Sequence, residues 1–251
     1  MGIITPIGAN TAMTAAAVRA GVSAYQASHY FTKKTRQPIT MTAVPEAVFT
    51  SMQVEIDEGS HYSGQYDHII KMAILALREA VAGHSIKKPI PLILAIPEPL
   101  PNVSYIDPQA LIKNLMNQKD LPLHPDLVRS IDSGRAAGIE ALTLARHFLY
   151  QQKAEYVLLG GSDSHEDALR IGALDKADRL LTSGSLDGLV PGSKDGFAPG
   201  EGAGFLLLTR DPEKAMTRGN RIVALCEPGN SQEPGHSTGV DLGPCAAAGR
   251  L

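Results

Sequence analysis

The side chains best placed for chemistry lie at a turn that opens a helix. Asp132, Ser133 and Gly134 form a turn signature, and apolar residues recur at helical spacing through the segment 135–151 that follows. A nucleophile at such a turn is exposed, and the positive end of the helix dipole stabilises its anionic form. The nearest hydroxyl is that of Ser133, and the predicted helix opens with Arg135.

Neither residue has the full context of a known catalytic motif. The segment 130–134 lacks the G-x-S-x-G pattern of hydrolase elbows, and Ser133 equally suits an ordinary turn and helix N-cap. Arg135 carries a guanidinium that stays protonated and is not a nucleophile. It can bind a carboxylate or phosphate beside the free N–H groups of the helix start, or pair with a protein carboxylate, which we favour.

Two other polar segments invite a ligand assignment. Residues 163–167 (DSHED) concentrate metal-ligand side chains, but Ser or Asp followed by acidic residues also marks a helix start, so we favour capping and predict no metal. Residues 200–204 (GEGAG) resemble a dinucleotide loop. That fingerprint must open a helix, whereas this segment leads into the apolar strand expected at 205–209, so no nucleotide and no other cofactor is predicted.

Composition excludes several classes of function. The chain has 251 residues and a net charge of -3, which gives no basic field for nucleic acids. Its apolar runs are far shorter than the roughly 20 residues of a membrane helix, so we expect no membrane association. Cys226 and Cys245 lack metal-ligand or disulfide spacing, which fits a reducing cytoplasm. None of the eight histidines is assigned as a base.

Apolar patterns predict a layered α/β fold. The segment 66–82 has helical spacing and is stopped by Gly83, and the continuous apolar run 90–96 suits a strand buried on both faces. We expect irregular structure over 22–60 and a long loop over 179–201. The other expected elements are an opening apolar run at 1–8, helices at 11–20 and 135–151, and strands at 127–131, 156–159, 205–209 and 221–227.

Four stretches occur in the order found in one enzyme family. They are 1–8 (MGIITPIG), 18–23 (VRAGVS), 131–161 around the turn, and 195–204 (DGFAPGEGAG). They resemble the opening G-x-V-T-P-L-G, the L-x-x-G-x-S, the nucleophile elbow D-T-A-C-S-S-x-L-x-A-L with its A-D-x-x-L-A-G-G strand, and the D-G-F-V-x-G-E-G-A-G of β-ketoacyl-ACP synthases. Residues 218–224 resemble the R-G-A-x-I-x-A that opens the second half of these thiolase-fold condensing enzymes.

The resemblance implies a thiolase-like layered α/β/α fold. Residues 1–217 would form the N-terminal condensing-enzyme domain with the first βαβαβ-type repeat. Residues 218–251 would be the truncated start of the second repeat, which in the family supplies two catalytic histidines. The chain would begin within the family's first strand, with Met1 as an internal methionine.

The resemblance also assigns site residues. Arg135 stands where the family has its cysteine nucleophile, so no intact catalytic residue is expected, and Ser133 is the alternative nucleophile. The family places the segment 200–204 in a tight turn near the active site. Residues expected to shape the substrate site are Gly134, Ala136, Phe197, Gly200, Gly202 and Gly204.

The function implied is that of a degenerate β-ketoacyl-ACP synthase-like protein of fatty-acid or polyketide type. It would act as a partner subunit or acyl-carrier binder, like chain-length factors, which also lack the cysteine. The expected partners are an acyl carrier protein or acyl thioester and a second copy or a ketosynthase, joined through the strand 155–159 that the family pairs across a two-fold axis. The alternatives are an active acyltransferase or condensing enzyme that uses Ser133 or a partner chain's residues, and an incomplete gene product.

Overall fold

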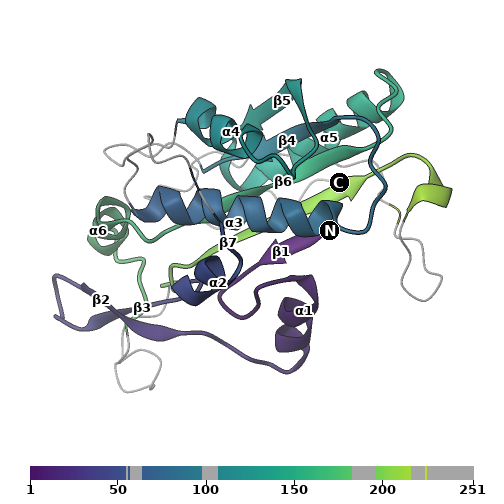
Figure 1. Ribbon diagram of the computed structural model, residues 1–251. Helices are drawn as coiled ribbons and strands as arrows, with labels where there is room; N and C mark the ends of the chain where they lie inside the picture. The colour runs from purple at the N-terminus through teal and green to yellow at the C-terminus, as the bar shows by residue number, and fades with distance from the viewer. Residues whose placement is uncertain (55, 57–63, 98–106, 183–195, 216–223, 225–251) are drawn as a thin grey trace, which may run out of the picture.

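A five-stranded sheet forms the centre of the computed structural model, which describes residues 1–54, 56, 64–97, 107–182, 196–215 and 224 (Figure 1). The strand order is β1-β7-β6-β4-β5. The strands are β1 (Gly2–Ile4), β4 (Ile90–Ala95), β5 (Leu123–Ile131), β6 (Val157–Ser164) and β7 (Glu201–Leu208).

The sheet is mixed. β4 pairs in parallel with β5 and β6, whereas β7 runs antiparallel to both β6 and β1. The carboxyl ends of β4, β5 and β6 therefore lie at the same edge of the sheet as the first residue of β7.

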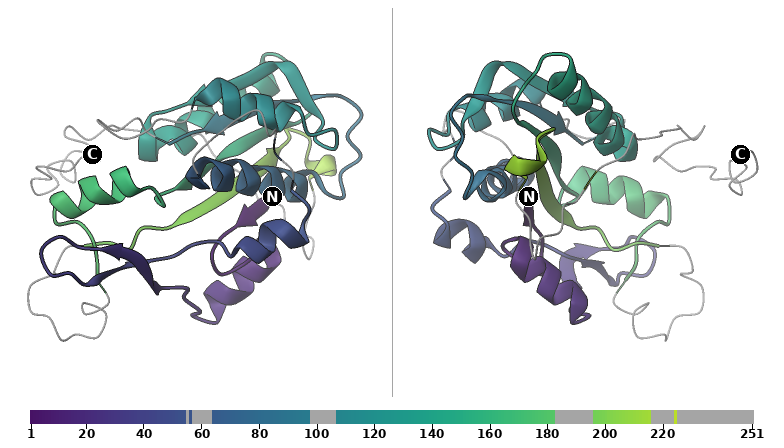
Figure 2. Two further views of the ribbon diagram at one scale, coloured as in Figure 1. Left: turned by 60° about the vertical axis from the view of Figure 1, so that its left-hand side comes forward. Right: turned by 90° about the vertical axis from the view of Figure 1, so that its right-hand side faces the viewer.

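Helices cover both faces of this sheet (Figure 2). Leu92 and Leu94 of β4 pack in one core cluster with α3 (Gly64–Val81) and α4 (Pro108–Met116). Ile93 packs in a second cluster with α5 (Ala137–Tyr150). Because successive strand residues point to opposite faces, the two clusters are the two sides of one α/β/α sandwich, as predicted.

The helix predicted at 66–82 is confirmed as α3, and Gly83 after it has a φ of 78°, a conformation that glycine adopts without strain. The expected strand 90–96 is confirmed as β4. The helix at 11–20 is α1 (Thr11–Arg19), capped by the Asn10 side chain. Three strands are longer than predicted, because β5 begins at Leu123, β6 continues through the glycine pair at 160–161 and β7 begins at Glu201.

The prediction of irregular structure over 22–60 is wrong. This region holds β2 (Gln26–Phe31), β3 (Pro38–Met41) and α2 (Glu46–Ser51), and β2 pairs with β3 in a separate two-stranded sheet. Ile39 and Met41 are buried against Ile171 of α6 (Ala168–Lys176) and Leu180. The ribbon is held by residues more than a hundred positions away, so its own pattern carries little signal.

A single carboxylate ties the beginning of the chain to α3. Glu79 Oε2 accepts the N–H of Ile3 at 3.0 Å, and both of its oxygens accept the N–H of Thr11, at 2.9 and 3.0 Å. The Thr11 hydroxyl also donates to Oε2 at 3.0 Å. Glu79 thereby joins β1 and the start of α1 to one helix.

Two expectations fall largely outside the part of the chain that the structure describes. The strand predicted at 221–227 and the truncated repeat at 218–251 include only residue 224 of the described set. Within the described set, every helix is too short or too polar to span a lipid bilayer.

The close pairing of β6 with β7 predicts a severe effect of Gly160→Ala. A Cβ at this position would lie 2.0 Å from the Gly204 carbonyl oxygen and 2.6 Å from the Phe205 Cα. We expect the free energy of unfolding to fall by about 3 kcal/mol, measured by urea denaturation. Gly172→Ala in α6 is the control, because a Cβ there meets no described atom within 4 Å, and the free energy of unfolding should rise by about 0.5–1 kcal/mol. Wild-type stability of Gly160→Ala would contradict this packing.

Candidate functional site

The sheet register gathers the predicted site segments at one edge. Ala95 of β4 is paired with Ile131 on one side and with Gly161 on the other, and Ser164 of β6 is paired with Glu201 of β7. The turn at 132–134, the segment 163–167 and the start of β7 therefore all lie at the carboxyl edge of the parallel strands. Open α/β sheets bind ligands at that edge.

The turn after β5 has the backbone of an elbow. Gly134 has a φ of 59°, in the left-handed region where glycine is unstrained, and a single 3-10 turn, Gly134–Ala136, leads into α5. The predicted helix at 135–151 is therefore one 3-10 turn followed by α5. Arg135 lies in the 3-10 turn, and its side chain is outside the described part of the structure.

Ser133 occupies the N-cap position of the 3-10 turn, but its hydroxyl does not cap it. The hydroxyl instead donates to Glu140 Oε2 at 2.7 Å, and both residues are at the surface. α5 also begins without a side-chain cap. The sequence alternative of an ordinary turn and N-cap thus holds for the position of Ser133 but not for its side chain, and its nucleophilic role stays a prediction.

The segment 163–167 does precede a helix, as predicted, but the capping residue is Asp167, and Asp163 has another partner. Asp167 is the cap of α6, accepting the N–H of Arg170 at 2.8 Å. Asp163 Oδ1 instead accepts from Arg170 Nη1 at 3.1 Å. Glu166, between them, takes part in neither contact.

The glycine-rich segment 200–204 is largely strand, so its expected tight turn is wrong. A Cβ on Gly200 would lie 2.4 Å from Thr42 Oγ1, and one on Gly202 would lie 3.1 Å from the Ile4 carbonyl oxygen, which explains both glycines by close approach. A Cβ on Gly204 would meet no atom of the described residues within 4 Å. Phe197 exchanges backbone hydrogen bonds with the segment 179–181, at 2.8 and 3.1 Å, before β7 begins.

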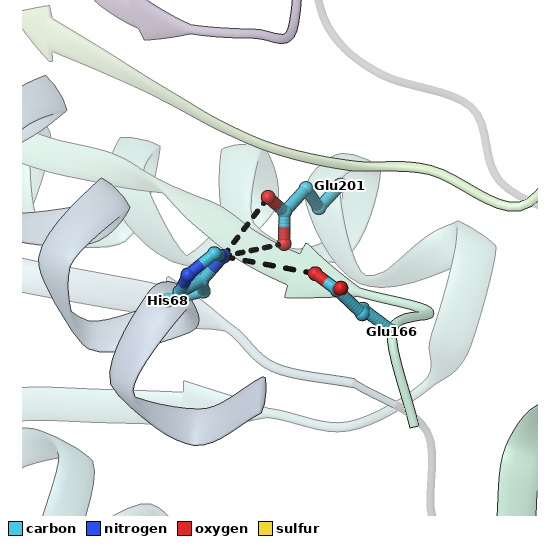
Figure 3. A group of neighbouring side chains, drawn as sticks. All are labelled: His68, Glu166 and Glu201. Atoms are coloured by element: carbon cyan, nitrogen blue, oxygen red, sulfur yellow. Dashed lines mark hydrogen bonds and ion pairs between the residues drawn. The ribbon is translucent and has the colours of Figure 1, made fainter. Parts of the chain in front are cut away.

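Glu201, which was not among the residues predicted from the sequence, lies at the centre of this edge. Its side chain is only 1% exposed. Oε1 accepts the N–H of Val44 at 2.7 Å, and Oε2 accepts from the Ser164 hydroxyl at 2.8 Å. His68 Nδ1 of α3 lies 3.0 Å from Oε1 and 3.2 Å from Oε2, and Glu166 Oε2 lies 3.9 Å from the same nitrogen (Figure 3).

The carboxylates around the imidazole control its charge. The hydrogen bond with Glu201 raises the pKa of His68 above its ordinary value against the opposing effect of partial burial, and the charges of Glu166 and Glu46 act in the same direction. His68 Nε2 lies 3.2 Å from Glu46 Oε2, and Lys71 Nζ lies 3.3 Å from Glu46 Oε1. In the absence of a bound cation, the imidazole is thus stabilised as a cation between acidic groups.

Two of these three residues, Glu166 and Glu201, lie in segments that the sequence singles out for other features. Glu166 lies in the acidic segment 163–167. Glu201 lies in the glycine-rich motif 200–204, in which only the glycines were predicted to shape the site. His68 is a polar residue within an amphipathic helix pattern and carries no local signal. The packing of α3 against β7 places His68 beside Glu201, and the pairing of β6 with β7 brings Glu166 to the same point.

A match to a family model supports the resemblance inferred from the sequence. Residues 127–214 match the model described as "Beta-ketoacyl synthase, N-terminal domain". The matched range contains the turn, α5, β6, the segment 163–167 and β7. No curated protein matches the chain.

Solved ketosynthase structures share the fold. The ketosynthase from module 6 of the bacillaene synthase of Bacillus subtilis 168, in a cysteine-to-serine mutant form, has a TM-score of 0.59 and 17% identity over 83% of this chain and 39% of its own. The oxazolomycin ketosynthase domain OzmH KS7 of Streptomyces albus JA3453 has a TM-score of 0.58 and 13% identity over 83% of this chain and 42% of its own.

A third ketosynthase, in the AntDE:AntF complex with a type II polyketide acyl-carrier protein, has a TM-score of 0.52 and 16% identity over 83% of this chain and 56% of its own. The chain therefore has the thiolase-like ketosynthase fold that was predicted, and it spans about two fifths of the length of the first two ketosynthases.

Burial of the Glu201 carboxylate predicts a large effect of Glu201→Gln. The amide would turn an N–H₂ group toward the donors of Val44 or Ser164 and would lose the charge that faces His68. We expect the free energy of unfolding to fall by about 3 kcal/mol in urea denaturation. The control is Glu155→Gln, which removes a partly exposed ion pair with Lys214 and should cost at most about 1 kcal/mol. Equal losses in the two variants would argue against a structural role for Glu201.

Proposed function

We propose that the chain is the N-terminal half of a β-ketoacyl synthase-like protein of fatty-acid or polyketide type that has lost condensing activity. It binds an acyl carrier protein or acyl thioester and acts as a partner subunit. Residues 1–217 form the condensing-enzyme domain, and residues 218–251 belong to the start of the second repeat. The observation that carries the proposal is the presence of Arg135 at the elbow that opens α5.

Condensation by the family mechanism requires a thiolate at this elbow. A thiol gains there from the helix dipole, which lowers its pKa, whereas a guanidinium is permanently cationic and gains nothing from the positive end of a helix. The two cysteines of the chain, Cys226 and Cys245, lie about a hundred residues further along the sequence. The elbow backbone is thus kept while its nucleophile is replaced.

A second candidate function is acyl transfer through Ser133. Its hydroxyl donates to Glu140 Oε2 at 2.7 Å, so a carboxylate is placed to accept the hydroxyl proton as the oxygen attacks a thioester, and to pass it to the carrier thiolate that leaves when the C–S bond breaks. Both groups are at the surface, where water competes for each of them. For that reason the partner-subunit function is the first proposal and acyl transfer the second.

Intact-protein mass spectrometry after incubation with an acyl-loaded carrier protein separates the two functions. We expect no added acyl mass on the wild type and one acyl group on Arg135→Cys, because the substitution restores a thiol at the helix start. Acylation of the wild type that is lost in Ser133→Ala would instead make the protein an acyltransferase. Ser130→Ala is the matched control, since Ser130 is an exposed serine of β5 outside the elbow. If Arg135→Cys also stays unmodified, Arg135 does not occupy the nucleophile position.

We further infer that the chain pairs with a second copy or with a ketosynthase through β5. The prediction that the strand 155–159 pairs across the dimer axis is wrong. This segment lies in β6, which is hydrogen-bonded to β4 on one side and to β7 on the other and has no free edge. β5 is an edge strand among the described residues. Ile131 O accepts from Ile96 N on the β4 side, so the alternate residues Val128 and Ser130 direct their backbone groups away from β4. Val128 O accepts from Arg129 Nη1 at 2.8 Å, and the backbone groups of Ser130 face the open edge.

Ser130→Pro tests this edge. Proline removes one outward N–H and its ring blocks an approaching strand, while the bonds of β5 to β4 are kept. We expect a dimer for the wild type in sedimentation velocity and at least a tenfold weaker association for Ser130→Pro, about 1.4 kcal/mol. Ser130→Ala should associate as the wild type does. A Ser130→Pro dimer of unchanged affinity would exclude the β5 edge as the interface.

A further inference from the structure

Three metal-ligand side chains from different parts of the chain converge on one point. His68 comes from α3, Glu166 from the connection between β6 and α6, and Glu201 from the start of β7 (Figure 3). One potential ligand atom of each lies within 4.8 Å of the others. In a tetrahedral zinc site with bonds of about 2.0–2.1 Å, neighbouring ligand atoms are about 3.3 Å apart. His68 Nδ1 lies 3.0 Å from Glu201 Oε1, close to that spacing, and 3.9 Å from Glu166 Oε2, so a bound ion would draw the Glu166 side chain slightly closer.

The groups behind these ligands are arranged as they are around bound metals. Metal-binding histidines commonly donate their second N–H to a carboxylate, and ligating carboxylates are themselves held by hydrogen bonds. His68 Nε2 lies 3.2 Å from Glu46 Oε2, which leaves Nδ1 directed at the two other carboxylates. Val44 and Ser164 each donate one bond to Glu201, so each of its oxygens keeps a lone pair for another partner.

The charges at this point are unbalanced without a cation. Among the described residues, no lysine or arginine nitrogen lies within 4.0 Å of the Glu166 or Glu201 carboxylates, and the imidazole is the basic group within that distance of both. Lys71 is engaged with Glu46 instead. Glu201 is buried and Glu166 is partly exposed, which gives an ion a route from solvent.

We propose that His68, Glu166 and Glu201 form a binding site for a divalent transition-metal ion of the zinc type. One imidazole nitrogen with carboxylate oxygens suits Zn²⁺ and its relatives better than Mg²⁺ or Ca²⁺, which prefer oxygen ligands throughout. Three protein residues leave at least one coordination position open to water. The ion would join α3, the β6–α6 connection and β7 at the edge of the sheet that holds the elbow, whether or not the protein transfers acyl groups.

Titration of the chelator-stripped full chain with Co²⁺ tests the site directly. We expect one equivalent to bind, with the visible d–d absorption of a four- or five-coordinate nitrogen and oxygen site, and Zn²⁺ to displace it and raise Tm. Glu166→Gln is the main variant, because this side chain is partly exposed and makes no structural hydrogen bond in the described structure. It should weaken Co²⁺ binding at least about tenfold, and His68→Ala should abolish the absorption.

Matched controls identify binding elsewhere on the chain. Glu213→Gln makes the same change at an exposed position of the 3-10 turn Pro212–Lys214, and His147→Ala removes a histidine near the end of α5, so both should bind as the wild type does. Absence of binding to a wild type that is folded by circular dichroism overturns the proposal. So does unchanged affinity in Glu166→Gln, or a thiolate charge-transfer band, which would place the ion on Cys226 or Cys245.

Discussion

The antiparallel pairing of β7 with β6 is the constraint on which the rest of the structure depends. The eight residues of each strand are matched along their whole length, from Val157 with Leu208 to Ser164 with Glu201. This register turns the chain back across the sheet, so that a strand late in the sequence completes the surroundings of the first one, β1. It also requires glycine at position 160, where the backbone of the neighbouring strand leaves no space for a side chain.

The same pairing decides the electrostatics of the carboxyl edge. Glu201 is the first residue of β7, and its register opposite Ser164 buries a carboxylate where the ends of several elements meet. Burial of an ionised carboxylate destabilises the folded state unless hydrogen-bond donors surround it. Here the donors are a backbone N–H, a hydroxyl and an imidazole from separate parts of the chain. The position of α3 against the sheet is therefore fixed by polar contacts at its beginning as well as by the apolar core along its length.

The sequence predicted those elements whose pattern is local. α3 has an apolar face and a terminal glycine, β4 is a continuous apolar run, and the elbow carries turn residues before a helical period, so each could be recognised by itself. The β2–β3 ribbon was not predicted, because it is buried by α6 and Leu180, which lie far away in the sequence. The cluster of His68, Glu166 and Glu201 was not predicted either. His68 and Glu201 are 133 positions apart, and no periodic pattern links the three residues. The assignment of the edge strand failed because strand order is a property of the whole sheet.

The contacts of Glu79 have a consequence for how the beginning of the chain opens. Short strands at the edge of a sheet usually fray, and their amides exchange with solvent independently of the core. Here the amides of Ile3 and Thr11 are both bonded to a carboxylate of the central helix, which is packed against the sheet over most of its length. Opening at either amide breaks contacts to the same side chain, so β1 and the start of α1 belong to the cooperative unit of α3 and exchange as part of the core.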